Sequence, residues 1–249
     1  GVSIPKQLQG QAYIVSGDAN FALRHYKQAR RDYELAIEAD DSSFQPYLGL
    51  ARLTLRDSDL DSAFKLATAA EDRDPANTMV QYTLGLINRY QGDLPAAEIS
   101  FLEAVRLFPR NLMANIELAS IRINQKRIDE AELYLDAVYA ASTNQPMAIY
   151  LSAVILATRG EYEEAELLLL RVQGLTENYL PAIYVRGLVA YQLGKNEAAA
   201  AALEQVIEVR PNNKPARMAL AGTYTNLQRP RAALRTLQPL LQSEGLADT

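Results

Sequence analysis

Apolar residues recur at helical spacing along the stretch Thr78–Asn111, in two runs that are separated by a short polar break. The break falls at Gly92 and Asp93, and the second run stops before Pro109. Asp93 is placed to cap the second run, and Pro95 falls in its first turn, where proline is tolerated. The pattern therefore predicts two short amphipathic helices joined by a tight turn.

A helical hairpin of this length cannot bury its apolar stripe alone, so the same pattern is expected elsewhere in the chain. Moving along the chain in steps of 34 residues finds further copies without insertions or gaps. The predicted repeats are 10–43, 44–77, 78–111, 112–145, 146–179, 180–213 and 214–247. Residues 1–9 precede the first repeat as a frayed lead-in, and 10–247 is predicted to form a single array.

Two columns of small residues support this alignment. Position 20 of the repeat is alanine throughout, at Ala29, Ala63, Ala97, Ala131, Ala165, Ala199 and Ala233. Position 8 is always glycine or alanine, at Gly17, Ala51, Gly85, Ala119, Ala153, Gly187 and Ala221. Small side chains let two crossing helices approach to about 8–10 Å, so we expect these columns at the helix crossing of each hairpin. A larger residue at Ala97 would force the hairpin open.

These columns resemble the tetratricopeptide repeat. The resemblance also includes larger residues at position 24, such as Tyr33 and Phe101, and proline at position 32, at Pro75, Pro109 and Pro211. It covers residues 10–247, although the usual aromatic residue at position 11 survives only as Tyr224. The resemblance implies an all-α fold, a right-handed α-α superhelix (solenoid) of seven 34-residue hairpins, and a role as a protein–protein interaction scaffold.

Composition excludes several classes of function. The net charge is −5, with 25 basic and 30 acidic residues in no long blocks, which argues against nucleic-acid binding. The chain has no cysteine and one histidine, His25, so neither zinc ligation nor a nucleophile–histidine catalytic site has its residues. We therefore predict no enzyme activity, no cofactor and no metal. No run is long and apolar enough to span a membrane, and Leu167–Leu170 is expected to lie in the core.

The resemblance also implies a binding surface. In the family, positions 2, 5, 9, 12 and 13 of the first helices point into the concave groove. The candidate groove residues on this chain are Arg52, Arg56, Met79, Tyr82, Arg89, Tyr90, Met113, Asn124, Met147, Tyr150, Tyr184 and Tyr191. Tyrosine and methionine suit an extended or helical peptide. The alternative is that some of these side chains pack between adjacent first helices.

Three of these candidates are arginines, Arg52, Arg56 and Arg89. If they converge without an acidic neighbour, their guanidinium groups offer paired donors to carboxylates, so the partner would carry an acidic segment or a free C-terminus. The alternative is that they pair with Asp18, Asp57 or Asp59 and only solvate the surface.

A narrower resemblance concerns Tyr184–Ala199 and Asn212–Ala221, which are similar to bacterial multi-repeat lipoproteins that accompany exosortase (PEP-CTERM) and exopolysaccharide systems. It implies a periplasmic or cell-envelope location rather than a cytoplasmic one, and a role in an exopolysaccharide export assembly. The alternative function is an envelope protein whose tyrosine-lined groove contacts a polysaccharide. Because the candidate groove is mostly aliphatic and aromatic, with Asn124 and Gln192 as its few amides, peptide binding is favoured.

The last predicted helix, Pro230–Gln242, contains Pro239 and is followed only by a short polar tail. Helical arrays usually finish with a polar capping helix, which is not found here. The pattern therefore predicts exposed apolar surface at this hairpin and possible end-to-end self-association, in a chain that is a segment of a longer protein or whose end a partner covers.

Overall fold

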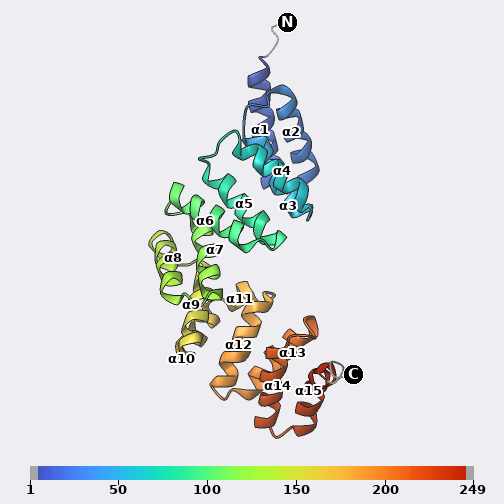
Figure 1. Cartoon of the computed structure of the whole chain (residues 1–249), viewed down its shortest axis with the longest axis vertical. Coiled ribbons are helices and arrows are strands. Elements are labelled where there is room, and N and C mark those ends of the chain that lie inside the picture. The colour runs from blue at the N-terminus through green and yellow to red at the C-terminus, as the bar shows by residue number, and fades with distance from the viewer. Residues whose placement is uncertain (1–4, 245–249) are drawn as a thin grey trace. The chain divides into compact units, whose positions relative to one another are not determined.

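The structure is a computed structural model that describes residues 5–244, and all regular structure within them is helical (Figure 1). The helices are α1 (Lys6–Ala22), α2 (Tyr26–Ala39), α3 (Gln45–Arg56), α4 (Leu60–Glu71), α5 (Thr78–Gln91), α6 (Leu94–Leu107), α7 (Leu112–Asn124), α8 (Ile128–Ala141), α9 (Pro146–Arg159), α10 (Tyr162–Arg171), α11 (Gln173–Thr176), α12 (Leu180–Gln192), α13 (Asn196–Val209), α14 (Lys214–Asn226) and α15 (Pro230–Glu244). The prediction of an all-α chain is confirmed.

The contacts divide the chain into two compact units. Unit 1 comprises Gly1–Gln125 and Asp136–Ala141, and unit 2 comprises Lys126–Leu135 and Ser142–Thr249. In unit 1 the helices pack as the pairs α1–α2, α3–α4 and α5–α6, and each second helix contacts the next first helix. In unit 2 the pairs are α9–α10, α12–α13 and α14–α15, and α13 contacts α14. Each unit is therefore built from stacked helical hairpins.

The turns inside the hairpins repeat one backbone conformation. A residue with positive φ occurs at Arg24, Ser58, Gly92, Lys126, Gly160, Gly194 and Gln228, at intervals of 34 residues. In the Thr78–Asn111 repeat, Gly92 ends α5 in the left-handed conformation, and the Asp93 side chain accepts a hydrogen bond from the Ala96 N–H at 3.0 Å. The predicted cap at Asp93 is therefore confirmed, and the 34-residue period is present in the backbone itself.

The alanine column lies in the core, as expected for a helix crossing. Its members have side chains that are at most 7% exposed, and six of them are fully buried. Tyr33 is the largest fully buried side chain and lies between two glycines, since a Cβ on Gly17 would be 2.6 Å from its ring and one on Gly49 would be 2.4 Å from it. These two glycines therefore make room for the aromatic ring of Tyr33 on the neighbouring helix α2.

Two local expectations need correction. The first helix begins at Lys6, so residues 6–9 are helical rather than a frayed lead-in, while residues 1–4 lie outside the described part. In the second helix of the fifth repeat, α10 ends at Arg171 and the short α11 follows. Of the run Leu167–Leu170, Leu169 is 2% exposed and lies in the core as predicted, whereas Leu167 and Leu170 are more than half exposed because they lie on the other side of α10 from the buried Ala165.

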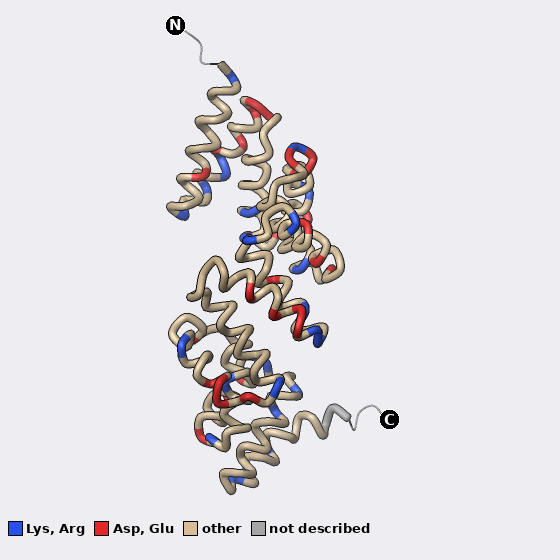
Figure 2. The backbone as a smooth tube through the Cα atoms, turned by 90° about the vertical axis from the view of Figure 1, so that its left-hand side faces the viewer, with Lys and Arg blue, Asp and Glu red and all other residues tan. Residues whose placement is uncertain are grey.

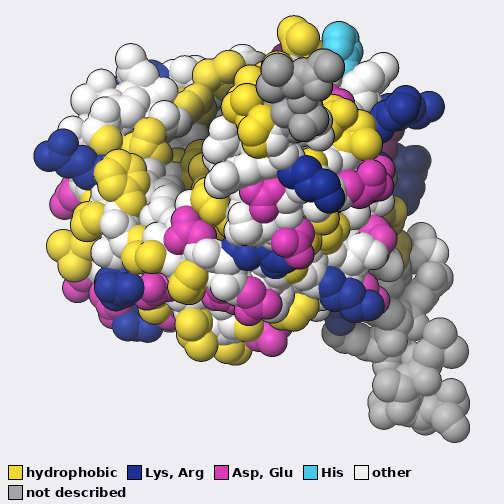
Figure 3. All heavy atoms as spheres, turned by 90° about the horizontal axis from the view of Figure 1, so that it is seen from above, with side chains coloured by type: hydrophobic (Ala, Val, Ile, Leu, Met, Phe, Trp, Pro, Cys, Tyr) yellow, Lys and Arg dark blue, Asp and Glu magenta, His cyan; other side chains and the backbone are white. Residues whose placement is uncertain are grey.

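Charge is distributed evenly over both units. Basic and acidic residues follow one another along the backbone (Figure 2), and both signs mix with apolar side chains on the face shown in Figure 3. Within residues 5–244, no helix combines the length and the apolar character needed to cross a bilayer. Because charge does not single out one face, the candidate site is sought among the grooves of the surface, and one of these lies in unit 1.

Candidate binding groove

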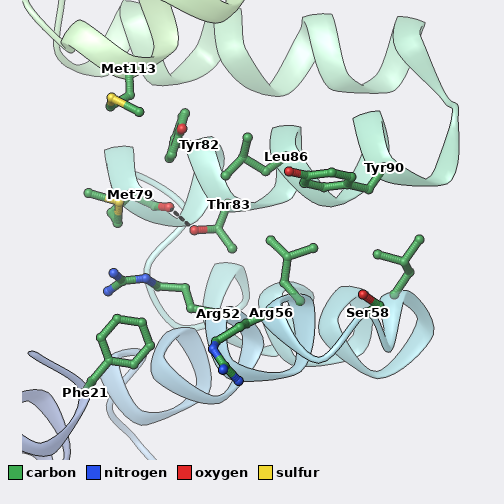
Figure 4. A pocket seen from close by; sticks show the side chains of 12 residues that line it. Phe21, Arg52, Arg56, Ser58, Met79, Tyr82, Thr83, Leu86, Tyr90 and Met113 are labelled. Atoms are coloured by element: carbon green, nitrogen blue, oxygen red, sulfur yellow. Dashed lines mark hydrogen bonds between the residues drawn. The ribbon is translucent and has the colours of Figure 1, made fainter. Parts of the chain in front are cut away.

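A groove of about 680 Å³ opens in unit 1 along the first helices of successive hairpins, α1, α3, α5 and α7 (Figure 4). We call it the unit 1 groove. Its lining residues are Phe21, Arg52, Leu55, Arg56, Ser58, Leu60, Met79, Tyr82, Thr83, Leu86, Tyr90 and Met113. Of the twelve residues that the sequence nominates, the structure brings together Arg52, Arg56, Met79, Tyr82, Tyr90 and Met113.

The repeat explains why these residues meet. Met79 and Met113 occupy the same position of consecutive repeats, and so do Arg52 and Leu86. Because the hairpins stack in register, residues 34 apart lie on the same face of neighbouring first helices. The groove is thus a row of equivalent helix positions that are contributed by several hairpins.

The floor of the groove is formed by α5. Tyr82 is only 9% exposed, and its ring packs against Phe101 of α6 at a centroid distance of 5.8 Å. Burial raises the pKa of the Tyr82 phenol to about 12, and the nearby Glu117 carboxylate adds to that rise. The Thr83 hydroxyl donates to the Met79 carbonyl at 2.8 Å, so this polar group is already satisfied. Tyr82 therefore forms part of the groove floor and leaves little of its ring exposed for contact with a ligand.

The rim is exposed and apolar. Met79 and Met113 are about half exposed on α5 and α7, and Tyr90 is 60% exposed at the end of α5. Methionine adapts to irregular surfaces, and tyrosine offers a large contact area with little loss of side-chain entropy. These three side chains are the most exposed apolar contacts of the groove.

Arg52 gives the groove a positive charge that has no ion-pair partner among the described residues. Its guanidinium lies over the Phe21 ring, 4.4 Å from the centroid, and Figure 4 shows it between Phe21 and Met79. Among residues 5–244, no carboxylate lies within ion-pair distance of Arg52. Stacking on an aromatic face holds a guanidinium without using its N–H donors, so these remain directed to the groove and the solvent.

The other two arginines are already paired. Arg56 donates to Asp57 at 3.0 Å and lies 3.9 Å from the centroid of the Tyr26 ring. Arg89 does not line the groove, and it donates to Glu117 at 2.7 Å. The prediction that three guanidinium groups converge without an acidic neighbour is therefore wrong. Arg56 pairs with Asp57, as the alternative interpretation of the sequence allowed. Arg89 pairs with Glu117, which the sequence analysis did not name as a partner.

The Arg89–Glu117 pair connects α5 and α7. The Glu117 side chain is 13% exposed, and burial raises the pKa of its carboxyl, whereas the charge of Arg89 lowers it. The pair thus holds two neighbouring first helices together, with its charge compensated inside the unit.

The remaining nominated residues lie elsewhere. Asn124 is exposed at the end of α7 and does not line this groove. Met147, Tyr184 and Tyr191 are half-buried on first helices of unit 2. Tyr150 is only 6% exposed and packs edge-on against Tyr179, 5.4 Å between centroids. The expectation that Tyr150 faces a ligand is therefore wrong, because it packs against a neighbour as the alternative allowed.

Sequence reasoning did not nominate Phe21, Leu55, Ser58, Leu60 or Thr83. Phe21 could have been found, because it occupies position 12 of the first repeat, one of the groove positions. Ser58 and Leu60 come from the turn between α3 and α4 and carry no such signal. No group of three or more potential metal ligands occurs among the described residues.

Family comparisons agree with the repeat pattern. Models of the tetratricopeptide repeat match residues 14–78, 82–146 and 190–246. A model of anaphase-promoting complex, cyclosome, subunit 3 matches residues 124–206. Comparison with curated proteins finds no match.

Solved structures resemble the chain over most of its length. PilF of Pseudomonas aeruginosa is 20% identical, with 90% of this chain and 98% of that chain covered and a TM-score of 0.69. The Cut9–Hcn1 hetero-tetramer of the anaphase-promoting complex gives 15% identity, 92% and 42% coverage, and a TM-score of 0.70. PilW, a type IV pilus biogenesis factor, gives 19% identity, 78% and 90% coverage, and a TM-score of 0.63. At these identities the likeness concerns the fold alone.

Proposed function

The chain belongs to the tetratricopeptide repeat family, and from this premise we propose that it is a non-catalytic interaction scaffold that binds a peptide segment of a partner protein in the unit 1 groove. The observation that carries the proposal is the combination of an unpaired, stacked Arg52 with exposed methionines on the neighbouring helices. Such a lining contains one strong polar contact and several adaptable apolar ones, which is the usual composition of a peptide site.

The charge of Arg52 selects for a carboxylate. A guanidinium that already rests on a ring has lost part of its side-chain freedom before a ligand arrives, so binding costs less entropy. Its free edge can donate two parallel hydrogen bonds to an Asp or Glu side chain or to a C-terminal carboxylate. We therefore place one acidic group of the partner at Arg52.

The methionines and Tyr90 define where the rest of the segment lies. Met79 and Met113 flank Tyr82 at one end of the groove, and Tyr90 lies at the other end of α5 (Figure 4). An extended or helical segment with apolar side chains on one face fits this row. The preferred ligand is thus an amphipathic peptide with an acidic residue opposite Arg52.

We propose further that the partner assembly lies in the bacterial cell envelope and serves exopolysaccharide export. One support is the similarity of the sequences Tyr184–Ala199 and Asn212–Ala221 to bacterial multi-repeat lipoproteins of exosortase and exopolysaccharide systems. The other is that the structural neighbour PilW is described as a type IV pilus biogenesis factor. Genes next to the coding sequence provide the check. Exosortase or polysaccharide genes are expected there, and a neighbourhood without secretion or polysaccharide genes in several genomes would count against this assignment.

Methyl NMR tests the groove directly, because the chain has only four methionines. Met79 and Met113 line the groove, whereas Met147 and Met218 lie on unit 2. Met218 is 59% exposed and Met113 is 51% exposed, so the two are matched reporters. We would select peptides from a random display library, synthesise the best binder, and titrate it into protein labelled at the methionine methyl groups.

The expected result is a saturable shift of the Met79 and Met113 signals while Met218 stays in place. A second peptide with Asn or Gln in place of each acidic residue should bind more weakly. Shifts confined to Met147 or Met218 would overturn the choice of groove. If exopolysaccharide fragments shift Met79 and no selected peptide does, the polysaccharide-contacting alternative replaces peptide binding.

A further inference from the structure

Another pocket, of about 320 Å³, lies in unit 2 among α10, α12 and α13. We call it the unit 2 pocket. Its lining includes Arg186 and an apolar wall formed by Leu169, Val189, Ala190, Ala201 and Ala202. Leu169 and Val189 are each 2% exposed, so the pocket reaches down to the core of unit 2.

Arg186 occupies a position of the repeat at which other repeats bury a leucine. The residues at intervals of 34 from it include Leu50, Leu84, Leu118 and Leu220, and each of these is at most 5% exposed. An arginine at this position brings a charged group toward the core, which is costly unless another group compensates the charge. Packing between hairpins therefore does not account for Arg186.

Two small residues of the same repeat leave space beside Arg186. Ala190 and Ala202 are each smaller than every residue that lies at a multiple of 34 positions from them. The residues equivalent to Ala202 include Leu66, Tyr134 and Leu168. Protein interiors are normally filled to high density, so a space next to the core that is lined by small side chains can admit a ligand without disturbing the fold.

The charge of Arg186 is not compensated by a carboxylate. Within residues 5–244, no hydrogen bond or ion pair engages its side chain. Glu166 also lines the pocket, but both of its carboxylate oxygens accept from the Lys195 ammonium, at 2.7 and 2.5 Å. Because that pair is neutral as a whole, the pocket keeps one positive charge next to its apolar wall.

We propose that the unit 2 pocket binds a small aliphatic monocarboxylate. The Arg186 guanidinium donates two parallel hydrogen bonds to the carboxylate, and the aliphatic tail lies against Ala190 and Ala202. The volume favours a small molecule over a peptide, because about 320 Å³ is near the lower limit of small-molecule sites. The site is independent of peptide binding in the unit 1 groove, since the two share no residue.

Hexanoate is the probe for this site, titrated into the full chain labelled at the alanine methyl groups and followed by NMR. Ala201 lines the pocket, and Ala76, which is also exposed, lies in the turn between α4 and α5 of unit 1. The Ala201 signal should shift saturably with a dissociation constant of about a millimolar, as is usual for so small a ligand, while Ala76 stays in place. Hexanamide, which lacks the charge, should bind at least about tenfold more weakly.

The length of the tail tests the size of the site. Affinity should rise by up to about fourfold for each methylene added between butanoate and hexanoate, and it should stop rising once the tail outgrows the pocket. A rise that continues through dodecanoate would mean that the acids adsorb to exposed apolar surface, which overturns the proposal. A peptide with a free C-terminal leucine that binds more tightly than every acid would also overturn it, in favour of a protein C-terminus.

Two substitutions separate the charge from the space. Arg186→Leu restores the leucine of the other repeats, and Ala202→Leu keeps the charge but fills the pocket with the residue found at Leu168. Each variant should fold, as circular dichroism can show, and each should lose hexanoate binding. Arg210→Gln is the matched control, because Arg210 is exposed at the end of α13 and does not line the pocket.

Arg210→Gln should bind hexanoate as the unaltered chain does, and so should Arg52→Gln in the unit 1 groove. Undiminished binding in folded Arg186→Leu or Ala202→Leu protein would overturn the proposal, and so would equal binding of hexanoate and hexanamide. Loss of binding in Arg52→Gln would place the acid in the unit 1 groove instead. A failure of peptides to bind that groove leaves these results unaffected, so the two proposals fail separately.

Discussion

The two units build their hairpins from the same small columns but line their first helices differently. At position 9, unit 1 has Asp18, Arg52, Leu86 and Ser120, whereas unit 2 has the uncharged residues Val154, Leu188 and Gly222. The columns at positions 8 and 20 are buried in both units. The buried positions 8 and 20 therefore stay small in both units, while position 9 on the first helices varies. Because the two sets of positions vary independently, the same fold can carry an arginine-containing groove in unit 1 without an arginine at the equivalent positions of unit 2.

A single position shows how the difference arises. Tyr82 and Tyr150 are equivalent residues of the two units, and Tyr82 lines the unit 1 groove. In unit 1 the residue before the next first helix is Asn111, whose side chain accepts a hydrogen bond from the Ala114 N–H at 3.0 Å and caps α7. In unit 2 the equivalent residue is Tyr179, which packs on Tyr150 instead of capping α12. Tyr150 therefore has an aromatic neighbour at a position where unit 1 has a capping asparagine.

The largest effect is expected from Tyr150→Ala. Because Tyr150 is buried against Tyr179, its truncation should lower the free energy of unfolding of unit 2 by about 3–5 kcal/mol. Hydrogen exchange measures the loss in unit 2 separately from unit 1. The control is Tyr90→Ala, which removes an exposed ring and should leave stability unchanged while it weakens peptide binding. Equal losses of stability in the two variants would refute the comparison.

Gly49→Ala should destabilise unit 1 by about 1–3 kcal/mol, because the added methyl meets a fully buried tyrosine ring. Urea denaturation followed by circular dichroism gives the change. Gly174→Ala in unit 2 is the control, since nothing lies within 4 Å of a Cβ there, and it should be neutral or stabilising by up to about 1 kcal/mol. A stable Gly49→Ala protein would show that Tyr33 can move.

Arg52→Gln should weaken binding of an acidic peptide about tenfold, which corresponds to about 1.4 kcal/mol for a charge-assisted contact. Titration calorimetry at two salt concentrations should also show a flatter salt dependence, because one ion pair is lost. Arg186→Gln in unit 2 is the matched control, because Arg186 lines a pocket between α10 and α13 rather than the groove. If both variants bind as the unaltered chain does, Arg52 has no role in recognition.

The smallest effect concerns the pH dependence of unit 1. Burial raises the pKa of Glu117 above its ordinary value, so the folded unit holds this proton more tightly than the unfolded chain. The protonated Glu117 carboxyl therefore contributes its full stabilisation of unit 1 below the pKa that it has in the unfolded chain. This stabilisation is lost as the pH rises through the pKa that Glu117 has in the folded unit. Glu117→Gln should flatten that part of the stability curve in acid denaturation experiments. An unchanged slope would mean that the charge of Arg89 cancels the effect of burial on the pKa of Glu117.

The sequence alone was sufficient to predict an all-α fold of tetratricopeptide repeats. Apolar spacing located the helices around Thr78–Asn111, and the alanine column at Ala97 and its equivalents marked the helix crossings that the structure buries. These features are local or periodic, because a helix boundary depends on caps and turns and a repeated interface must use the same residues each time. The row of first-helix positions that contains the unit 1 groove could also be read from the repeat.

The tertiary structure alone decided which of those positions are exposed and which charges are free. Arg89 is paired because Glu117, 28 residues away, lies on the neighbouring first helix, and Tyr150 is buried because Tyr179 covers it. Both outcomes depend on a residue of the adjacent hairpin whose identity the repeat does not constrain. Helical periodicity gives the direction of a side chain from its own helix, whereas exposure and ion pairing depend on what the next helix places opposite it.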